Sequence, residues 1–303
     1  VVAPTWFALT DNDGGYVSYG SQNYVNLAHD MGLQVWAVVD NFNQGTNVDS
    51  AVLFAKTSVR KKLIASLMEE VQNLGLDGLN LDIEGIKSSA GPQYVQFIRE
   101  LSVACRNAGI ILSVDNYVPM PYNSFYNWAE QGRVVDYYII MAYDEHYAGS
   151  EEAGSVSSIG FVNQGVADTL QSVPADQLIL GMPFYTRVWS ETPVSDDGAA
   201  VSTTEDTSDS DTLYELDCYS AGMKEVQNLI STNGAVPVWS DTDGQYYVEY
   251  INGGVTYKIW VEDATSLEEK LKVMQSNQLA GGAFWKLGLE DPAVWDTIIK
   301  YIN

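Results

Sequence analysis

The chain has 303 residues, of which 46% are hydrophobic, enough to bury the core of one large α/β domain. Its 40 acidic and 15 basic residues give a formal net charge of -25. Such a charge repels the phosphates of nucleic acid and the anionic surface of a membrane, so we expect no nucleic-acid partner. Because no stretch approaches the roughly 18 consecutive apolar residues that cross a bilayer, membrane insertion is not expected either.

The cysteines and histidines exclude two further classes of site. Two cysteines are too few for a disulfide framework, and Cys105 lies in a helical apolar pattern that favours a buried free thiol. The two histidines, His29 and His146, have no cluster of Cys or His around them. The sequence therefore carries no zinc-type signature, and we expect no metal and no cofactor.

Strand-like and helix-like segments alternate along the chain, which is typical of a parallel α/β architecture. The predicted strands are 1–9, 33–41, 76–84, 110–116, 134–143, 178–185 and 279–285. The predicted helices are 21–31, 58–74, 92–107, 161–171 and 266–276. The spacing is that of a repeated β/α unit.

Residues 77–84 read Asp-Gly-Leu-Asn-Leu-Asp-Ile-Glu. In a β-strand, the period of two places Asn80, Asp82 and Glu84 on one face and three aliphatic side chains on the other. Such a strand suits a barrel whose strand ends open into an active site. The alternative is a surface strand with a polar solvent face, but the flanking glycines are typical of a buried strand that other backbone approaches closely.

Residues 188–262 break the β/α rhythm. They begin with an acidic, Ser/Thr-rich run over 195–217, which we interpret as a solvated, mobile loop rather than a binding element. A helix-like stretch follows at 222–232, and Asn252-Gly-Gly254 between two aromatic stretches indicates a β-hairpin. The predicted domains are a first part of the main domain over 1–187, an α+β insertion over 188–262, and a last part over 263–303.

The segment 77–84 resembles the D-x-x-D-x-D-x-E signature of glycoside hydrolase family 18, the chitinase-like (β/α)8 barrels, with Asn80 where many chitinases have an aspartate. Three further motifs follow in the family's order: Met141-Ala-Tyr143-Asp144, Gly181-Met-Pro-Phe-Tyr185-Thr-Arg187-Val-Trp189 and Gly281-Gly-Ala-Phe-Trp285. Asn80, together with the segments 143–147 and 285–290, looks most similar to the bacterial branch that trims peptidoglycan, including spore-cortex N-acetylglucosaminidases.

The resemblance implies a (β/α)8 TIM barrel with a small α+β insertion before the last strand. In the family the acidic signature lies on the fourth strand, whereas here it lies on the third predicted strand. Residues 1–7 resemble the family's second strand, so we expect the chain to lack the first β/α unit. The strands 1–9 and 279–285 would then flank an opening or a substitute segment.

Cleavage of a glycosidic bond needs an acid for the leaving oxygen and a group that stabilises positive charge at the anomeric carbon. In family 18 the substrate's own 2-acetamido oxygen is the nucleophile, so one protein acid suffices. The resemblance implies that Glu84 is this acid and later the base, while Asp82 orients the acetamido group and stabilises the oxazolinium charge. Two carboxylates this close cannot easily both ionise, so one proton is shared or one pKa rises. We expect Asn80 to support Asp82.

The other motifs supply the remaining candidates. The resemblance implies that Tyr143 donates a hydrogen bond to the acetamido oxygen, that Asp144 helps to hold the sugar, and that Trp285 forms an apolar floor beneath it. The alternatives are a core tyrosine, a helix cap and a core tryptophan. Tyr185 and Arg187 could hydrogen-bond ring substituents, although Arg187 could equally pair with its acidic surroundings.

Several polar residues at predicted strand ends have two interpretations. Substrate contact and capping of the following segment explain 40–41, 115–117 and 145–146 equally well. Asp77, out of phase with the polar face of its strand, is better explained by a structural hydrogen bond.

The sequence thus predicts a retaining, substrate-assisted hydrolase of β-1,4-linked N-acetylglucosamine glycans, with peptidoglycan of the spore cortex or cell wall as substrate. We expect a monomer that is extracellular, cell-wall or spore-associated. Chitinase is the first alternative, and its grooves are often lined with exposed tryptophans; the candidates here are Trp6, Trp36, Trp128, Trp189, Trp239 and Trp260. The second is a sugar-binding lectin on the same fold, but a pure binder has no reason to tolerate paired buried carboxylates.

Overall fold

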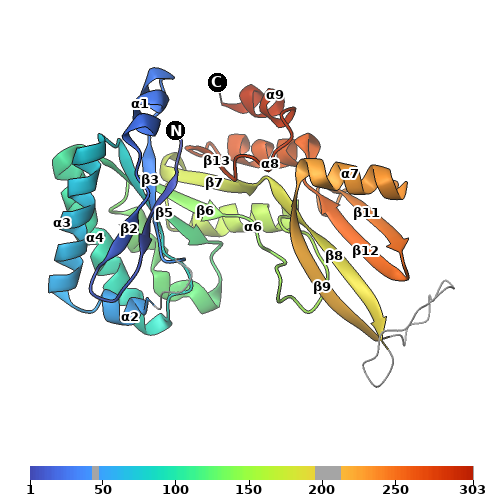
Figure 1. Cartoon of the computed structure of the whole chain (residues 1–303), viewed down its shortest axis with the longest axis horizontal. Helices are drawn as coiled ribbons and strands as arrows, with labels where there is room; N and C mark the ends of the chain where they lie inside the picture. Colours follow the sequence, from blue (N-terminus) through green and yellow to red (C-terminus); the bar gives the residue numbers. More distant parts are fainter. Residues whose placement is uncertain (43–47, 195–212, 303) are drawn as a thin grey trace. The chain divides into compact units, whose positions relative to one another are not determined.

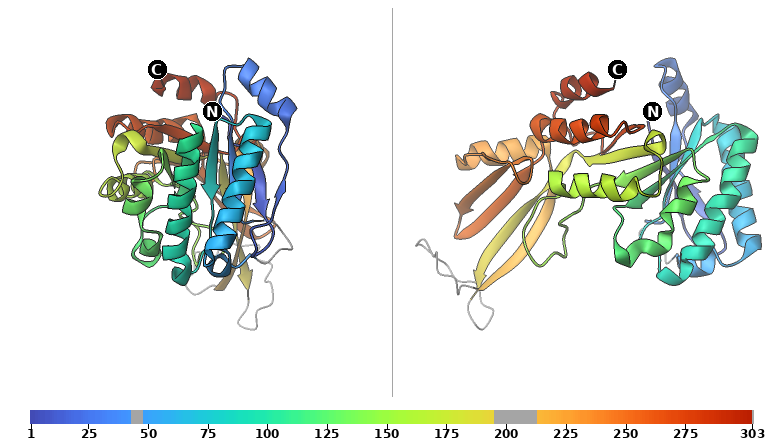
Figure 2. Two further views of the ribbon diagram at one scale, coloured as in Figure 1. Left: turned by 90° about the vertical axis from the view of Figure 1, so that its left-hand side faces the viewer. Right: turned by 180° about the vertical axis from the view of Figure 1, so that it is seen from behind.

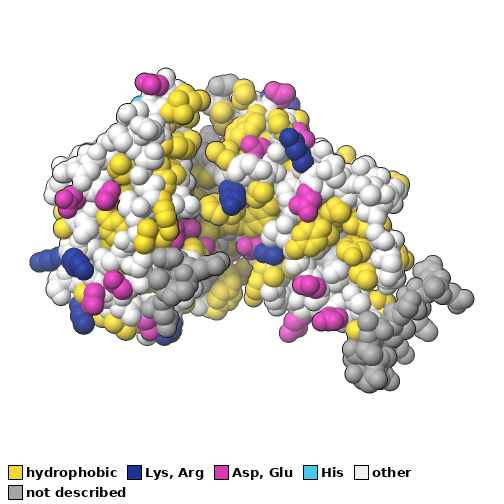
Figure 3. Space-filling view, in the orientation of Figure 1, with side chains coloured by type: hydrophobic (Ala, Val, Ile, Leu, Met, Phe, Trp, Pro, Cys, Tyr) yellow, Lys and Arg dark blue, Asp and Glu magenta, His cyan; other side chains and the backbone are white. Residues whose placement is uncertain are grey.

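The computed structural model describes residues 1–42, 48–194 and 213–302. The chain forms two compact units, coloured from blue to red along the sequence in Figure 1. The first unit contains residues 1–140 and 168–179, and the second contains residues 141–167 and 180–303. The acidic side chains of the described residues lie scattered over the face shown in Figure 3, not in one patch.

A twisted sheet forms the centre of the first unit. Its strands are β1 (Thr5–Leu9), β2 (Tyr16–Ser18), β3 (Trp36–Asp40), β4 (Gly78–Asp82), β5 (Ile111–Tyr117) and β6 (Tyr137–Met141). The strand order is β2-β1-β3-β4-β5-β6, and the neighbours from β1 to β5 pair in parallel. The short β2, which the sequence did not predict, pairs antiparallel with β1.

Helices accompany this sheet, and the two longest, α3 and α4, run side by side (Figures 1 and 2). The α-helices are α1 (Gln22–Asp30), α2 (Ser50–Leu53), α3 (Thr57–Leu74), α4 (Gly91–Ala108) and α5 (Trp128–Gly132). In α4, the buried side chains Tyr94, Phe97, Ile98, Leu101 and Cys105 recur every three or four residues, which is the pattern of one helix face against a core. Cys105 is a free thiol, as predicted.

Short 3-10 turns complete the first unit: η1 (Ser88–Ala90), η2 (Pro121–Tyr126) and η3 (Ala175–Gln177). Among the described residues, every helix is too short or too polar to span a bilayer.

The second unit contains two sets of strands. In the first set, β7 (Leu178–Pro183), which begins in the first unit, neighbours β13 (Gly281–Trp285). The second set is an antiparallel sheet of order β10-β11-β12-β8-β9. Its strands are β8 (Tyr185–Val194), β9 (Leu213–Gly222), β10 (Val238–Ser240), β11 (Gln245–Asn252) and β12 (Val255–Val261).

One face of the antiparallel sheet is covered by α7 (Met223–Asn233), which buries Val226 in a cluster with Val188, Val248 and Ile259. The other helices of the unit are α6 (Ile159–Thr169), whose last turn reaches into the first unit, α8 (Ala264–Ser276), α9 (Val294–Ile298) and the 3-10 turn η4 (Ile299–Tyr301).

The predicted hairpin is confirmed, because β11 and β12 pair with Asn252 opposite Val255. Gly253 and Gly254 in the turn have φ of 61° and 82°, values that suit the tight turns of two-residue hairpins.

All seven predicted strands form, as do the predicted helices. The prediction of a loop over the acidic run 195–217 is wrong in part. Residues 195–212 lie outside the described residues, but 213–217 begin β9, so the loop prediction is wrong there. These residues pair with β8, and cross-strand hydrogen bonds outweigh an acidic local composition. The domain boundaries at 187 and 262 and the opening beside the outer strands stay predictions.

Candidate active site

Acidic residues from three neighbouring strands of the first unit lie in one row. The parallel register makes Asp40 of β3 the partner of Asp82 of β4, and Leu81 the partner of Val114 of β5. One residue further along, Asp82 therefore comes beside Asp115. Because these positions are at the carboxyl ends of parallel strands, the row occupies the edge where α/β folds build their sites.

Two glycines shape the strand that carries Asp82. A Cβ on Gly78 would lie 2.6 Å from the Trp36 ring and 3.1 Å from the Ile111 carbonyl oxygen, so only glycine fits at this point. Gly85 has φ of 61°, and this left-handed conformation turns the chain away directly after Glu84. The prediction of a buried strand closely approached by its neighbours is confirmed.

Glu84 is held at its backbone and at its side chain. The Asn41 side chain donates to the Glu84 carbonyl at 2.8 Å and accepts from the Glu84 N–H at 3.0 Å. The Tyr117 hydroxyl accepts from the Gly85 N–H at 3.2 Å and hydrogen-bonds the Glu84 carboxylate. Burial, this bond and the Glu84 charge all raise the pKa of Tyr117, so its hydroxyl remains a donor to Glu84.

Asp82 is the most strongly perturbed carboxyl group of the row. Burial raises its pKa to about 9, and the negative charges of Asp115, Glu84 and Asp40 add to this rise, as does a hydrogen bond with Glu84. Asp82 therefore carries a proton at neutral pH.

Asp115 has a pKa raised to about 7. Burial is the main cause and the Glu84 charge adds to it, whereas a hydrogen bond from Asn80 opposes it. The Asn80 amide donates to Asp115 Oδ1 at 3.0 Å and to Ser113 Oγ at 2.9 Å. Burial also raises the pKa of Asp40, against the opposing hydrogen bond from the Phe42 N–H. Three carboxyl groups in adjacent strands are thus shifted towards their neutral forms.

Some polar atoms around this row have no hydrogen-bond partner within the part of the chain that the structure describes. They include Asn80 Oδ1, Asp82 Oδ1 and the hydroxyls of Tyr94 and Tyr138. Buried polar atoms are normally paired, so these groups are available to a substrate or to water. The same described residues contain no ion pair to Asp82 or Asp115, and no group of three or more Asp, Glu, His or Cys side chains placed to hold a metal ion.

The second unit holds the other predicted site residues. The Tyr185 hydroxyl and the Arg187 guanidinium both donate to Asp144 Oδ1, at 2.9 and 3.0 Å. The ring of Tyr143 meets that of Tyr185 edge to face, with centroids 6.2 Å apart. Burial would lower the pKa of Arg187, but the hydrogen bond and charge of Asp144 outweigh it and raise that pKa. Arg187 therefore pairs with an acidic neighbour, one of the two alternatives left open by the sequence.

Trp285 ends β13 with 39% of its surface exposed, so one part of the ring is open to a ligand. Glu145 accepts hydrogen bonds from the backbone and side chain of Ser158, directly before α6, and so acts as a cap. In the first unit, Asp77 accepts from the Val35 N–H and pairs with His29, which is the structural role expected for it.

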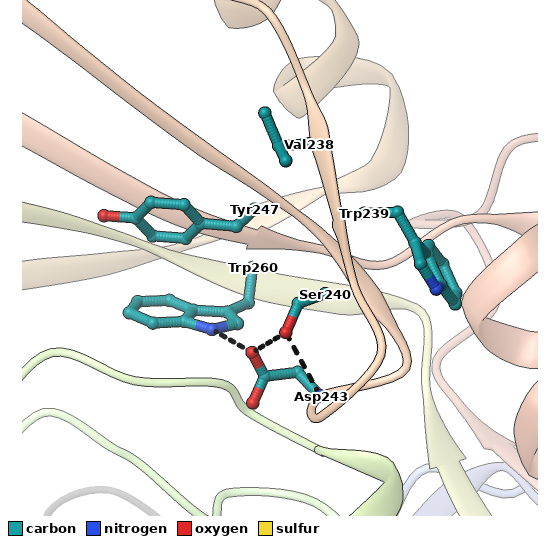
Figure 4. A pocket seen from close by; sticks show the side chains of 6 residues that line it. All are labelled: Val238, Trp239, Ser240, Asp243, Tyr247 and Trp260. Atoms are coloured by element: carbon teal, nitrogen blue, oxygen red, sulfur yellow. Dashed lines mark hydrogen bonds between the residues drawn. The ribbon is translucent and has the colours of Figure 1, made fainter.

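An aromatic pocket of about 370 Å³ lies on the antiparallel sheet of the second unit (Figure 4). The rings of Tyr247 and Trp260 lie side by side there, with centroids 4.9 Å apart. Asp243 Oδ2 accepts from the Trp260 indole at 3.1 Å and from Ser240 Oγ at 2.7 Å. Trp239 also lines the pocket. Aromatic faces beside a fixed carboxylate suit the C–H and O–H groups of a sugar.

The sequence named Asp115 and Tyr117 only as residues at a strand end. A sharper signal was present, because three successive predicted strands each carry an aspartate near their ends, at 40, 82 and 115. Parallel strands in register bring such residues together. The contact between Tyr117 and Glu84 depends on the path of the chain after β4 and left no signal in the sequence.

Residues 14–290 match the sequence profile of the family described as glycosyl hydrolases family 18. The chain belongs to this family. It is similar to the uncharacterized glycosylase YvbX of Bacillus subtilis, with 23% identity over 99% of this chain and 83% of that protein. It is also similar to the cortical fragment-lytic enzyme of Bacillus subtilis, with 23% identity over 83% of this chain. This family 18 chain spans only 56% of the length of that enzyme.

Solved structures support the same fold. A chitinase from Chromobacterium violaceum matches with a TM-score of 0.83 and 21% identity, over 99% of this chain and 90% of that one. A spore cortex-lytic enzyme of Bacillus megaterium matches with a TM-score of 0.82 and 16% identity, over 99% of this chain and 67% of that one. The predicted fold class, the parallel strands and helices of family 18, is confirmed, although the described strands do not close into a barrel. Membership of the family makes the protein a glycosidase.

Proposed function

We propose that the protein is a retaining, substrate-assisted glycosidase that cleaves β-1,4-linked N-acetylglucosamine glycans, with peptidoglycan as its substrate. One observation carries the proposal: Glu84 is fixed by Asn41 and Tyr117 beside an Asp82 that keeps its proton at neutral pH. A positioned acid next to a group that can carry a negative charge is what the first step of this reaction requires.

In the first step, Glu84 enters in its protonated form and gives this proton to the glycosidic oxygen while the substrate's acetamido oxygen attacks the anomeric carbon. The bond to the leaving oxygen breaks, and a cyclic oxazolinium ion forms. Asp82 orients the acetamido N–H and, as a carboxylate, offsets the positive charge of the ring.

In the second step, Glu84, now a carboxylate, takes a proton from a water molecule that attacks the anomeric carbon. The oxazolinium ring opens and the acetamido group is restored. Two successive inversions at this carbon retain its configuration.

Membership of family 18 supports roles for residues of the second unit in the same reaction. Tyr143 would donate a hydrogen bond to the acetamido oxygen, and Trp285 would support the sugar through its exposed ring. Asp144, Tyr185 and Arg187 would bind ring substituents, and their mutual hydrogen bonds keep the three polar groups in a fixed arrangement. Asn80 would bind substrate through Oδ1, which has no hydrogen-bond partner among the described residues.

The choice of peptidoglycan rests on the bacterial relatives and on Asn80. Relatives named for lysis of spore cortex or its fragments match this chain over 83% or more of its length. A protein with this substrate would act outside the cell, at the cell wall or in the spore, and we expect it to be a monomer.

A second candidate function, chitinase, is favoured by the aromatic pocket. Of the tryptophans that could line a groove, Trp239 and Trp260 line this pocket, whereas Trp6, Trp36 and Trp189 are buried. The likeness to the Chromobacterium chitinase concerns the fold alone.

Digestion of three purified substrates side by side tests the proposal: spore cortex, vegetative peptidoglycan and chitin, with mass spectrometry of the products. We expect fragments with N-acetylglucosamine at the new reducing end from cortex or peptidoglycan, formed at least about a hundredfold more slowly by a Glu84→Gln sample. Products from chitin alone would replace the proposal by the second candidate. Binding of glycans without any product would identify a lectin.

A further inference from the structure

The acidic row contains one more carboxylate than the proposed reaction uses. Glu84 supplies the proton for the leaving group and Asp82 meets the oxazolinium charge, which leaves Asp115 without a task. Asp115 is nevertheless largely enclosed, at the carboxyl end of β5. Burying a carboxyl group without a cation is unfavourable, so its presence beside Asp82 calls for a reason.

The chemistry of Asn80 supplies that reason. An amide carries no charge and does not take up a proton at neutral pH, so Asn80 cannot share the proton of Asp82 although both lie on the same face of β4. It can donate hydrogen bonds, and it gives one to Asp115 Oδ1 at 3.0 Å. Asn80 thus holds Asp115 in place one residue beyond the Leu81–Val114 pair, where continuing the register makes Asp82 and Asp115 lateral neighbours.

We propose that Asp115 is the positioning residue that shares the proton of Asp82. Without substrate, the proton resides on Asp82 and Asp115 is the anion that accepts from Asn80. When Asp82 turns its carboxylate to the acetamido N–H, its O–H bond breaks and an O–H bond forms on Asp115. The total charge of the row does not change, so Asp82 becomes negative without adding an uncompensated charge to the interior.

Other titratable groups act on this pair and must be kept constant in any test. Asp40 on β3 and Glu84 after β4 contribute negative charge to Asp82. Tyr94 on α4 interacts with both aspartates, and Tyr126 on η2 interacts with Asp82. The hydroxyl groups remain neutral over the working pH range, because burial raises the pKa of both tyrosines, that of Tyr126 to about 12.

The shared proton depends on the proposed function only for its effect on catalysis. An exchange of the side chains at positions 80 and 115 tests the shared proton itself. The variants are Asp115→Asn and the double variant Asn80→Asp/Asp115→Asn, which moves the carboxylate from β5 to β4 and keeps one amide and one acid in hydrogen-bond contact. Asp136→Asn is the matched control, because Asp136 accepts from the Leu112 N–H near the other end of β5. Thermal melts establish that each variant folds.

The first measurement is the titration of the Asp82 side-chain carbon by NMR without substrate. We expect Asp115→Asn to lower the midpoint by about one pH unit or more, because a neighbouring negative charge is lost. The double variant should return the midpoint towards that of the wild type, and Asp136→Asn should leave it unchanged. An unchanged midpoint in Asp115→Asn overturns the shared proton, whatever the enzyme's substrate.

The second measurement is the pH dependence of kcat/KM on the substrate that the wild type cleaves. We expect Asp115→Asn to move the alkaline limb of this profile to lower pH. A shift of about one pH unit lowers kcat/KM about tenfold above the limb, and the double variant should recover most of this loss. If Asp115 had only a structural role, its substitution would change the stability of the fold but not the position of the alkaline limb. Hydrolysis that does not require Glu84 would overturn the proposed function, and the NMR titration would then decide on the shared proton alone.

Discussion

The two units of the chain bury carboxyl groups in opposite ways. In the second unit, Glu262 accepts from Lys270 at 2.7 Å, and both side chains are only 1% exposed. The remaining oxygen of Glu262 accepts from Ser266 at 2.9 Å, and Gln245 also donates to the carboxylate at 2.6 Å. In the first unit, Asp82 and Asp115 have no ion pair within the described part of the chain, and Asp82 Oδ1 has no hydrogen bond there.

The difference separates a structural carboxylate from a functional one. Glu262 still has a raised pKa, because burial outweighs the attraction of Lys270, but every partner it needs belongs to the fold and joins β11 and β12 to α8. Asp82 and Asp115, by contrast, are buried without a cation from the described residues, although Asn80 donates a hydrogen bond to Asp115. In the proposed reaction, the missing positive charge is supplied by the oxazolinium ion, which exists only during turnover.

The largest effect, on stability, is expected at Glu262, because its buried charge is fully compensated by partners within the fold. Lys270→Met leaves Glu262 as an unpaired buried charge, which destabilises a protein by about 3–5 kcal/mol. Lys272→Met is the matched control, because Lys272 pairs with Glu269 on the same helix but is 52% exposed, and such exposed pairs contribute little to stability. Urea unfolding measures both. Equal stability of the two variants would show that the Glu262–Lys270 pair is not a structural element that the fold depends on.

Glu84→Gln should lower turnover at least about a hundredfold and leave the free energy of unfolding nearly unchanged, since a general acid contributes roughly 10²–10⁴ in rate. Glu69→Gln, on the exposed face of α3, controls for the change of side chain. The measurement is initial rate on the cleaved glycan together with a thermal melt. Near-wild-type hydrolysis by uncontaminated Glu84→Gln would show that another residue is the acid.

Asp82→Asn should abolish most activity and yet stabilise the fold at high pH. The pKa of Asp82 is about 9 in the folded state and near 3.8 in the unfolded chain, so between these values the folded state binds the extra proton. Wild-type stability therefore falls as the pH rises from about 4 to about 9 through this group, and asparagine removes that fall. Urea unfolding at pH 4, 7 and 9 should show a gap between variant and wild type that widens with pH. A constant gap would mean that Asp82 is not buried in its neutral form.

The smallest effect concerns the aromatic pocket, where binding depends on rings and not on buried charge. If chitin is a substrate, Trp260→Ala should raise KM for chitin oligomers up to about tenfold with kcat unchanged, as expected for one aromatic contact of about 0.5–1.5 kcal/mol. Tyr219→Ala, an exposed ring on β9 outside the pocket, is the control. Identical KM values for the two variants would exclude the pocket from substrate binding.

The sequence predicted the strands well because the β/α rhythm and the glycines beside Asp82 are local signals. It predicted Asp82 and Glu84 because they lie two residues apart at the end of a predicted strand, although β4 itself ends at Asp82. The role of Asp115 was left open between substrate contact and capping, because it depends on the register of β4 with β5. The pairing of Glu262 with Lys270 was not predicted at all. Both look like ordinary surface residues in sequence, and only the packing of α8 against the sheet buries them.

The most direct test is the affinity for a thiazoline analogue of the oxazolinium ion, measured by calorimetry against N-acetylglucosamine on wild type, Asp82→Asn and Lys272→Met. We expect the wild type to bind the thiazoline far more tightly than the product, because transition-state-like species are bound preferentially. Asp82→Asn should lose this preference, and Lys272→Met should keep it. Equal affinity of the wild type for both ligands would contradict substrate-assisted catalysis and would point to another nucleophile or to a lectin.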